Sequence, residues 1–117
     1  MTRFVLISCF ILLSACTEPA GSDIKVIIGA TLINASEPPV SHSVIVVKDD
    51  YIVAAGPQQM VPVPPGSAKT EAYGKFLTLQ GGGEVKVGSK ANLILLDGHP
   101  DSNPKVERRM IDGRWVQ

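Results

Sequence analysis

The sequence predicts an all-β fold in one small domain, and three observations lead to that prediction. Eleven glycines and nine prolines interrupt segments rich in valine and isoleucine, a composition that favours strands and turns. No long segment carries apolar residues at the 3.6-residue period of an amphipathic helix. The 117 residues, 44% of them hydrophobic, suffice for one core and not for two. Short strands separated by turns therefore indicate an antiparallel sandwich or barrel.

The first 16 residues differ in kind from the rest of the chain. Arg3 precedes an apolar run from Phe4 to Leu13 that only Ser8 interrupts, and "LSAC" closes the segment at 13–16. One basic residue, a short apolar run and small residues before a cleavage point are typical of a secretory signal. A run of roughly ten residues is too short to cross a bilayer core of about 30 Å as a helix.

The order "LSAC" also resembles the lipobox of bacterial lipoproteins, in which a peptidase cuts before the cysteine and the cysteine is lipidated. The resemblance implies a lipoprotein signal peptide at 1–15, lipidation of Cys16 and a flexible tether at 16–23. Cys9 would be discarded with the signal. Membrane lipid, bound through Cys16, is the implied partner. The implied location is the bacterial cell envelope, on its periplasmic or extracellular side.

Strand patterns begin near residue 24. The segments "DIKVIIGATLIN" at 23–34 and "HSVIVVKDDYIVAAG" at 42–56 are rich in β-branched residues, and the polar break at 48–50 predicts a hairpin in the second. We expect 57–69, "PQQMVPVPPGSAK", to be an extended surface crossing, because proline lacks the donor that a central strand needs. The segments at 75–79 and 91–97 are predicted strands, and a loop is predicted at 98–104.

The clearest local signal is the C-terminal "VERRMIDGRWVQ". Asp112-Gly113 lies between Met110-Ile111 and Trp115-Val116, and Asp-Gly is a residue pair that a type I′ hairpin favours. The lone tryptophan, Trp115, is expected to be a packing residue of this hairpin.

Residues 27–78 resemble the N-terminal segment of the metal-dependent amidohydrolases, and residues 82–116 resemble the C-terminal segment of the same family, closest to its secreted imidazolonepropionase-like and prolidase-like branch. The first part carries "GATLI" opening a strand, a valine-rich hairpin ending in "AAGP", the proline-rich crossing and "GKFLT" at 74–78. The second carries a Gly-x-x-x-x-Gly turn, "ANLILLD" and a closing "GRWV". Asn92 stands where the family usually has aspartate.

In that family the two segments form a small β-sandwich beside a (β/α)₈ barrel that lies between them in sequence. The resemblance implies a composite β-sandwich over 24–117, with halves at 24–78 and 84–117 and a glycine-rich joint at 79–83. A barrel needs about 250 residues, whereas "LQGGG" alone separates the halves here. The resemblance therefore implies an all-β sandwich without a TIM barrel.

The family hydrolyses carbon–nitrogen bonds with divalent metals such as zinc, bound by barrel residues that include a His-x-His pair. This chain has no His-x-His, so we expect no catalytic residue, no cofactor-binding residue and no metal ligand in it. Three functions stay open: a non-catalytic lipoprotein remnant, a fragment of a genuine amidohydrolase whose barrel is absent from this chain, and an interaction module at the cell envelope. Self-association through an exposed barrel-facing surface is a further expectation.

Other polar residues are interpreted as structural. His42 lies at a strand entrance and His99 in a turn, and both are expected to be surface histidines. Serine–histidine catalysis by Ser41 or Ser43 with His42 is disfavoured, because neighbours in a strand point to opposite faces. The aspartates in turns are expected to bond nearby amides; they are Asp97, Asp101 and Asp112.

Two binding functions are disfavoured by the sequence. Gly83–Lys90 nearly spells a phosphate-binding loop, but its last two residues are reversed and a strand, not a helix, is expected to follow. Eleven basic residues balance eleven acidic ones, so the chain lacks the basic footprint of a nucleic-acid-binding protein.

Overall fold

A computed structural model describes residues 24–116, and the segment 1–23 and Gln117 lie outside the described residues. The described chain holds nine strands and one short 3₁₀ helix, in the order β2 Ile24–Ile28, β3 Thr31–Leu32, β4 Ser43–Lys48, β5 Tyr51–Pro57, β6 Ala68–Glu71, β7 Phe76–Leu79, β8 Leu93–Leu96, η3 Pro100–Ser102, β9 Val106–Ile111 and β10 Arg114–Val116. No α-helix and no (β/α)₈ barrel occurs in this range, and the prediction of an all-β fold is confirmed.

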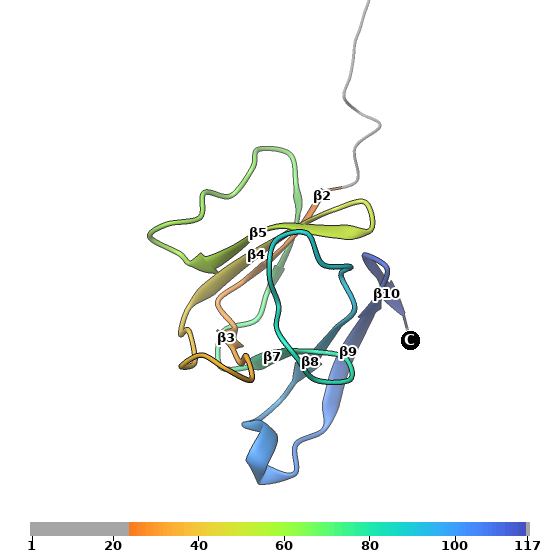
Figure 1. Ribbon diagram of the computed structural model, residues 1–117. Coiled ribbons are helices and arrows are strands. Elements are labelled where there is room, and N and C mark those ends of the chain that lie inside the picture. Colours follow the sequence, from red (N-terminus) through yellow and green to blue (C-terminus); the bar gives the residue numbers. More distant parts are fainter. Residues whose placement is uncertain (1–23, 117) are drawn as a thin grey trace, which may run out of the picture.

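The strands form two sheets that face each other (Figure 1). The first sheet has the order β5-β4-β2-β6, and the second has the order β10-β9-β8-β7-β3. The main core lies between them and takes buried side chains from both sheets, among them Ile27, Ile45, Leu77, Leu93 and Met110. Alternation along each strand places these residues on the inner face, which is how two sheets bury a common core.

The β-branched segment at 23–34 forms two strands, which belong to different sheets. β2 belongs to the first sheet and β3 to the second, and Gly29 lies between them with φ of +96°. A left-handed backbone at this point favours glycine, and the Tyr73 ring lies where a Cβ would stand. β-Branched residues continue on both sides of the glycine, so the composition alone does not reveal the change of sheet.

The expected purely antiparallel pairing is also wrong, because both sheets are mixed. β2 pairs parallel with β6 and β3 pairs parallel with β7, while the other pairings are antiparallel. Parallel neighbours cannot be joined by a tight turn and need a long connection. Residues 29–67, which include β3, β4 and β5, form this connection between β2 and β6, and the crossing at 58–67 is its last part, leading from β5 to the start of β6 beside β2.

The crossing also covers the outer face of the first sheet. Val61 from the crossing packs with three strand valines, and we call this set the outer valine cluster: Val26, Val44, Val46 and Val61. As a result β4 is buried on both faces from Ser43 to Val47. The crossing was predicted, but its last residues form β6, whose "AKTE" sequence shows no apolar alternation that could have marked a strand.

Both predicted hairpins are present. β4 and β5 turn at Asp49-Asp50, with Lys48 opposite Tyr51, and β9 and β10 turn at Asp112-Gly113. Asp112 has φ of 49° and Gly113 has φ of 81°, as a type I′ turn requires. A Cβ on Gly113 would collide with the Asp49 carbonyl oxygen, so the tips of the two hairpins lie in direct contact.

Candidate functional site

The glycine-rich joint at 79–83 connects the two halves of the chain, and it leads from the end of β7 towards β8. These strands pair antiparallel from Phe76 opposite Leu96 to Leu79 opposite Leu93. The pairing continues into the joint, where the Gln80 N–H donates to the Asn92 carbonyl at 2.8 Å. Gly81, Gly82 and Gly83 follow with φ of 84°, 87° and 100°. Three left-handed residues in succession are accessible to glycine and to few other residue types.

The Ala35 N–H donates to the Gly83 carbonyl of the joint at 3.4 Å, and the Asn34 side chain holds Val85, two residues after the joint. Asn34 Oδ1 accepts the Val85 N–H at 2.7 Å and Asn34 Nδ2 donates to the Val85 carbonyl at 3.4 Å. Val85 is 3% exposed and belongs to the main core. Sequence reasoning missed Asn34; the available signal was an amide side chain at the end of a β-branched run.

Asn92, which departs from the aspartate usual in the family that the sequence resembles, has a structural role here. Its Oδ1 accepts the Asp112 N–H at 2.7 Å and so holds the C-terminal turn against the start of β8. The amide oxygen accepts this hydrogen bond as a carboxylate would, but without a charge. The Asp112 carboxylate lies 3.7 Å from the Lys90 ammonium, and both side chains are about half exposed.

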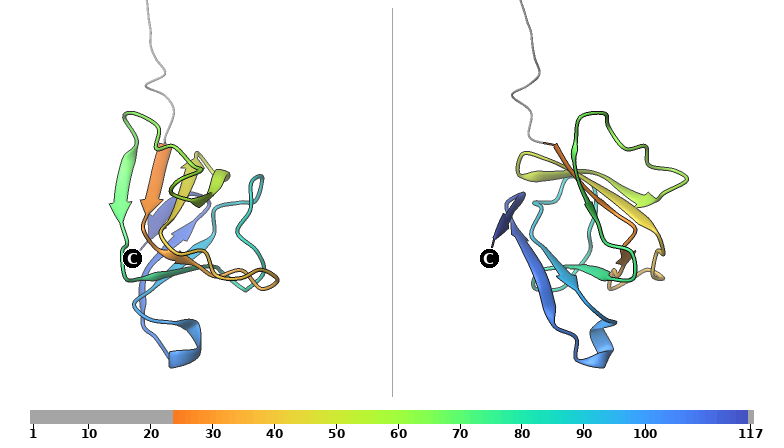
Figure 2. Two further views of the ribbon diagram at one scale, coloured as in Figure 1. Left: turned by 90° about the vertical axis from the view of Figure 1, so that its left-hand side faces the viewer. Right: turned by 180° about the vertical axis from the view of Figure 1, so that it is seen from behind.

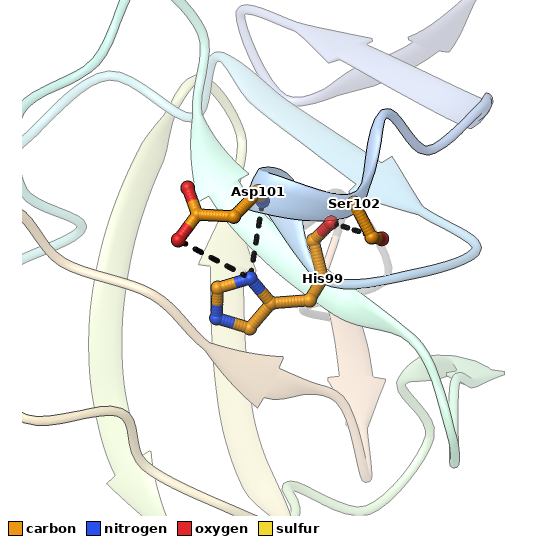
Figure 3. A network of polar contacts seen from close by, with 3 residues as sticks. All are labelled: His99, Asp101 and Ser102. Carbon is orange, nitrogen blue, oxygen red and sulfur yellow. Dashed lines mark hydrogen bonds and ion pairs between the residues drawn. The ribbon is translucent and has the colours of Figure 1, made fainter.

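A His–Asp–Ser cluster lies around η3, formed by His99, Asp101 and Ser102 (Figure 3). His99 Nδ1 accepts the Asp101 main-chain N–H at 3.1 Å, so it has no proton to give to the Asp101 carboxylate 3.8 Å away. The Ser102 hydroxyl donates to the His99 main-chain carbonyl at 2.7 Å and not to the imidazole. A catalytic triad needs the opposite arrangement, with aspartate accepting from Nδ1 and serine donating to Nε2. The cluster therefore caps a 3₁₀ turn.

His42, the second histidine, contacts a different aromatic residue from His99. His42 precedes β4 with φ of 51°, and its ring centroid is 6.0 Å from that of Tyr73, whereas the His99 ring contacts Phe76 at 5.4 Å. Ser43 is fully buried and its hydroxyl donates to the Ala30 carbonyl at 2.7 Å. This hydrogen bond leaves the Ser43 proton engaged with the backbone and not with His42.

The remaining predicted residues fall into structural positions. Asp97 Oδ1 accepts the Lys105 N–H at 2.9 Å, as predicted for an aspartate in a turn. Within residues 24–116, the carboxylates of Asp101 and Asp112 accept no such bond from a main-chain amide. The Gly83–Lys90 segment leads into β8, a strand, whereas a phosphate-binding loop opens a helix.

The C-terminal hairpin carries a shallow hollow on its surface, lined by Val106, Glu107, Arg108, Arg109 and Val116. The Arg108 guanidinium lies 4.0 Å from the centroid of the Trp115 ring, a distance suited to a cation–π contact. Trp115 packs on the main core, as predicted. Glu107 is bound to the Lys75 ammonium at 2.8 Å.

Within residues 24–116, no three His, Cys, Asp or Glu side chains are arranged to hold a metal ion. The same range contains no helix of the length and apolar character that crossing a bilayer requires. Cys9 and Cys16, and with them the predicted signal, lipidation site and the whole predicted tether at 16–23, lie outside the described residues. Large apolar side chains are exposed at scattered positions of the described chain: Tyr51, Val53, Met60, Tyr73, Val87, Val106 and Val116.

No family model matches the chain, and no curated protein matches it. Among solved structures, the chain is similar to one described as a structural and catalytic characterization of molinate hydrolase, at 26% sequence identity and a TM-score of 0.43. The match covers 48% of this chain and 12% of that chain. The chain therefore matches about an eighth of the length of that hydrolase.

Proposed function

We propose that this chain is a non-catalytic, lipid-tethered β-sandwich of the amidohydrolase type, with a binding or structural role at the bacterial cell envelope. Two kinds of observation support the proposal. Motifs that resemble both ends of the amidohydrolases occur in the family's order, at 27–78 and 82–116. The chain between these segments is a glycine-rich joint, and the two segments fold into one pair of sheets.

The direct pairing of β7 with β8 is the observation on which the proposal rests. Four residue pairs join the last strand of the N-terminal half to the first strand of the C-terminal half, from Phe76–Leu96 to Leu79–Leu93. Residues 80–92 are the whole connection between them, and Val85 of that connection is buried in the core. A (β/α)₈ barrel needs about 250 residues, so no barrel fits between these strands.

A sandwich of this architecture has no barrel, the part of the family's fold to which the resemblance assigns hydrolysis. Hydrolysis in the family depends on a metal-activated water, held by several converging ligands. By the resemblance those ligands belong to the barrel, so the cofactor-binding residues would have been lost with it. The described chain retains a closed core and an outer surface. A domain with these two features can bind a partner or serve a structural role.

Purified full-length chain with added zinc is expected to show no hydrolysis of dipeptides or cyclic amides, with an active amidohydrolase assayed in parallel as the positive control. Metal-dependent turnover that copurifies with the chain would contradict the proposal. Genomic sequencing between codons 78 and 84 gives an independent test. An intact barrel sequence at that point would instead favour the fragment of a genuine amidohydrolase.

The lipid tether is part of the same proposal and rests on the sequence alone. Arg3, the apolar run and "LSAC" at 13–16 support cleavage before Cys16 and lipidation of its side chain. Cys16→Ser is expected to abolish lipidation, measured by mass spectrometry of the mature N-terminus, and to reduce the share of the protein in the membrane fraction, measured by cell fractionation. Cys9→Ser is the matched control, because Cys9 would be removed with the signal. Equal behaviour of the two variants would contradict the tether.

A further inference from the structure

The first sheet ends in an open edge at β6. This strand pairs with β2 on one side, and in the described chain no strand pairs with its other side. Figure 2, left, shows β6 in green as the outermost strand, beside β2 in orange. Ala68, Lys69 and Glu71 are exposed and Thr70 is half-buried. An edge of this kind presents unpaired N–H and C=O groups and can template the addition of another strand.

The direction of the backbone groups on β6 follows from one hydrogen bond. The Ala72 N–H donates to the Ile28 carbonyl at 2.7 Å, so Ala72 faces β2. Because successive residues of a strand turn their backbone groups to opposite sides, Thr70 also faces β2. Lys69 and Glu71 therefore direct their N–H and C=O groups outward, away from the sheet.

The other three sheet edges are less accessible. The outer side of β5 is bonded to residues 88–89, which precede β8, since the Ile52 N–H donates to the Ser89 carbonyl and the Gly88 N–H donates to the Ile52 carbonyl, each at 2.8 Å. β3 is two residues long and bridges to Val40 on its outer side. β10 is three residues long, and Trp115 alone turns its backbone outward, because Arg114 and Val116 face β9.

The sequence of β6 is complementary to itself when read antiparallel. If two copies meet with Thr70 opposite Thr70, Lys69 of each copy lies opposite Glu71 of the other. The two outward-facing residues of one edge are then matched with those of the other edge, which allows four main-chain hydrogen bonds. Lys69 and Glu71 also share one face of the strand, because they are aligned with Val26 and Ile28 of β2. Opposite charges directly across an antiparallel pair stabilise it, and like charges destabilise it.

We propose that β6 is a docking edge for a second copy of this chain, which pairs antiparallel about Thr70 and joins the two first sheets into one continuous sheet. The two-fold symmetry gives the same contact twice, as in an isologous dimer. An edge lysine alone would discourage strand addition. A lysine followed two residues later by glutamate instead selects one partner, a copy of itself, in one register. This inference concerns a surface that the proposed function does not use and stands independently of it.

A charge-swap series tests the register by sedimentation velocity of the full chain in mild detergent. The wild-type chain is expected to dimerise with rising concentration, and Lys69→Glu or Glu71→Lys alone is expected to weaken the dimer about ten-fold, because each creates two like-charge pairs. An equal mixture of the two single variants, or the double variant, restores opposite charges at both pairs and is expected to restore association.

Circular dichroism verifies that each variant is folded. A wild-type chain that stays monomeric, or single variants that associate like the wild type, would overturn the proposal.

A cross-linking experiment tests the symmetry axis and remains sensitive to a weak dimer. In the proposed dimer, Thr70 of one copy would lie opposite Thr70 of the other in a non-hydrogen-bonded pair, with the two Cα atoms about 4.5 Å apart. A disulfide can span this distance. Thr70→Cys is therefore expected to give a covalent dimer under mild oxidation. Ala68→Cys is the matched control on the same face, since the two copies of that residue would lie about 14 Å apart at 3.4 Å per residue. The wild-type chain corrects for Cys9 and Cys16. Equal cross-linking of both variants, or of neither, would contradict the register.

Discussion

The two sheets of this molecule are assembled in different ways. The first sheet takes all four strands from residues 24–71, whereas the second takes β3 and β7 from before the joint and β8, β9 and β10 from after it. The first sheet also has a cover of its own, the crossing that closes the outer valine cluster. The second sheet exists only if the two halves of the chain meet. Its stability therefore depends on how the joint connects them.

Truncation of the core in the second sheet is expected to give the largest effect. Leu93 is fully buried in β8 and opposes Leu79 of β7, so it lies where the halves join. Leu93→Ala should lower the free energy of unfolding by about 2–5 kcal/mol, measured by urea titration. Leu79→Ala, at a half-buried position of the same pair, should cost less. Equal losses would show that the degree of burial does not set the cost of truncation at this pair.

The contact between the two hairpin tips should give the next largest effect. Gly113→Ala puts a Cβ against the Asp49 carbonyl at a φ of 81°, and we expect a loss of about 1–3 kcal/mol in the free energy of unfolding. Gly74→Ala is the matched control, because Gly74 has φ of 80° and no atom within 4 Å of an added Cβ. The difference between the two variants isolates the steric contact. No difference would show that the tips separate without cost.

The attachment of Val85, two residues after the joint, to the N-terminal half should contribute about 1 kcal/mol. Asn34→Ala removes both hydrogen bonds to Val85, a net loss of that order in the free energy of unfolding. Asn34→Asp keeps an oxygen that can accept the Val85 N–H and should recover part of the loss. Thermal unfolding of both variants provides the measurement. If the two variants lose the same stability, the bond accepted by Oδ1 does not contribute to holding Val85.

Lengthening the joint should give the smallest effect. The space around Gly81 and Gly82 is open, and doubling the length of a flexible loop costs only about 0.6 kcal/mol in closure entropy. An insertion of glycine and serine residues between Gly82 and Gly83 should therefore leave the fold intact, as seen by urea titration. The same insertion between Asp49 and Asp50 should cost more, because it lengthens a two-residue turn that touches Gly113. Equal costs would show that the joint is as constrained as the turn.

Strand existence and the terminal turn could be predicted from the sequence because their signals are local. Asp112-Gly113 marks its own turn, and the proline-rich crossing excludes a central strand by its lack of donors. The change of sheet at Gly29 could not be predicted, since the β-branched pattern continues across it and the ring that packs against this glycine, that of Tyr73, lies far along the chain. β6 was missed for the same reason, because its partner β2 gives it strand conformation while its own residues carry no apolar pattern.

In the candidate site, too, local roles could be predicted from the sequence, whereas long-range contacts could not. The environments of Asp97 and Trp115 agreed with residue type and position, as turn and packing chemistry allow. The role of Asn34 depends on a contact with a residue 51 positions away, and no local pattern reveals such a contact. Asn92 was noticed for its departure from a family pattern, but its hydrogen bond to the Asp112 amide became visible only in three dimensions.

The cover over the first sheet makes the proline-rich crossing a point of vulnerability. A protease that cut between Pro57 and Ala68 would leave the four strands of that sheet paired, because their ladder does not include the crossing. Release of Val61 would nevertheless expose Val26, Val44 and Val46 together on one flat face. Contiguous apolar patches of this kind promote aggregation. A single cut in the crossing would thus make the folded domain prone to aggregation while its strands were still paired.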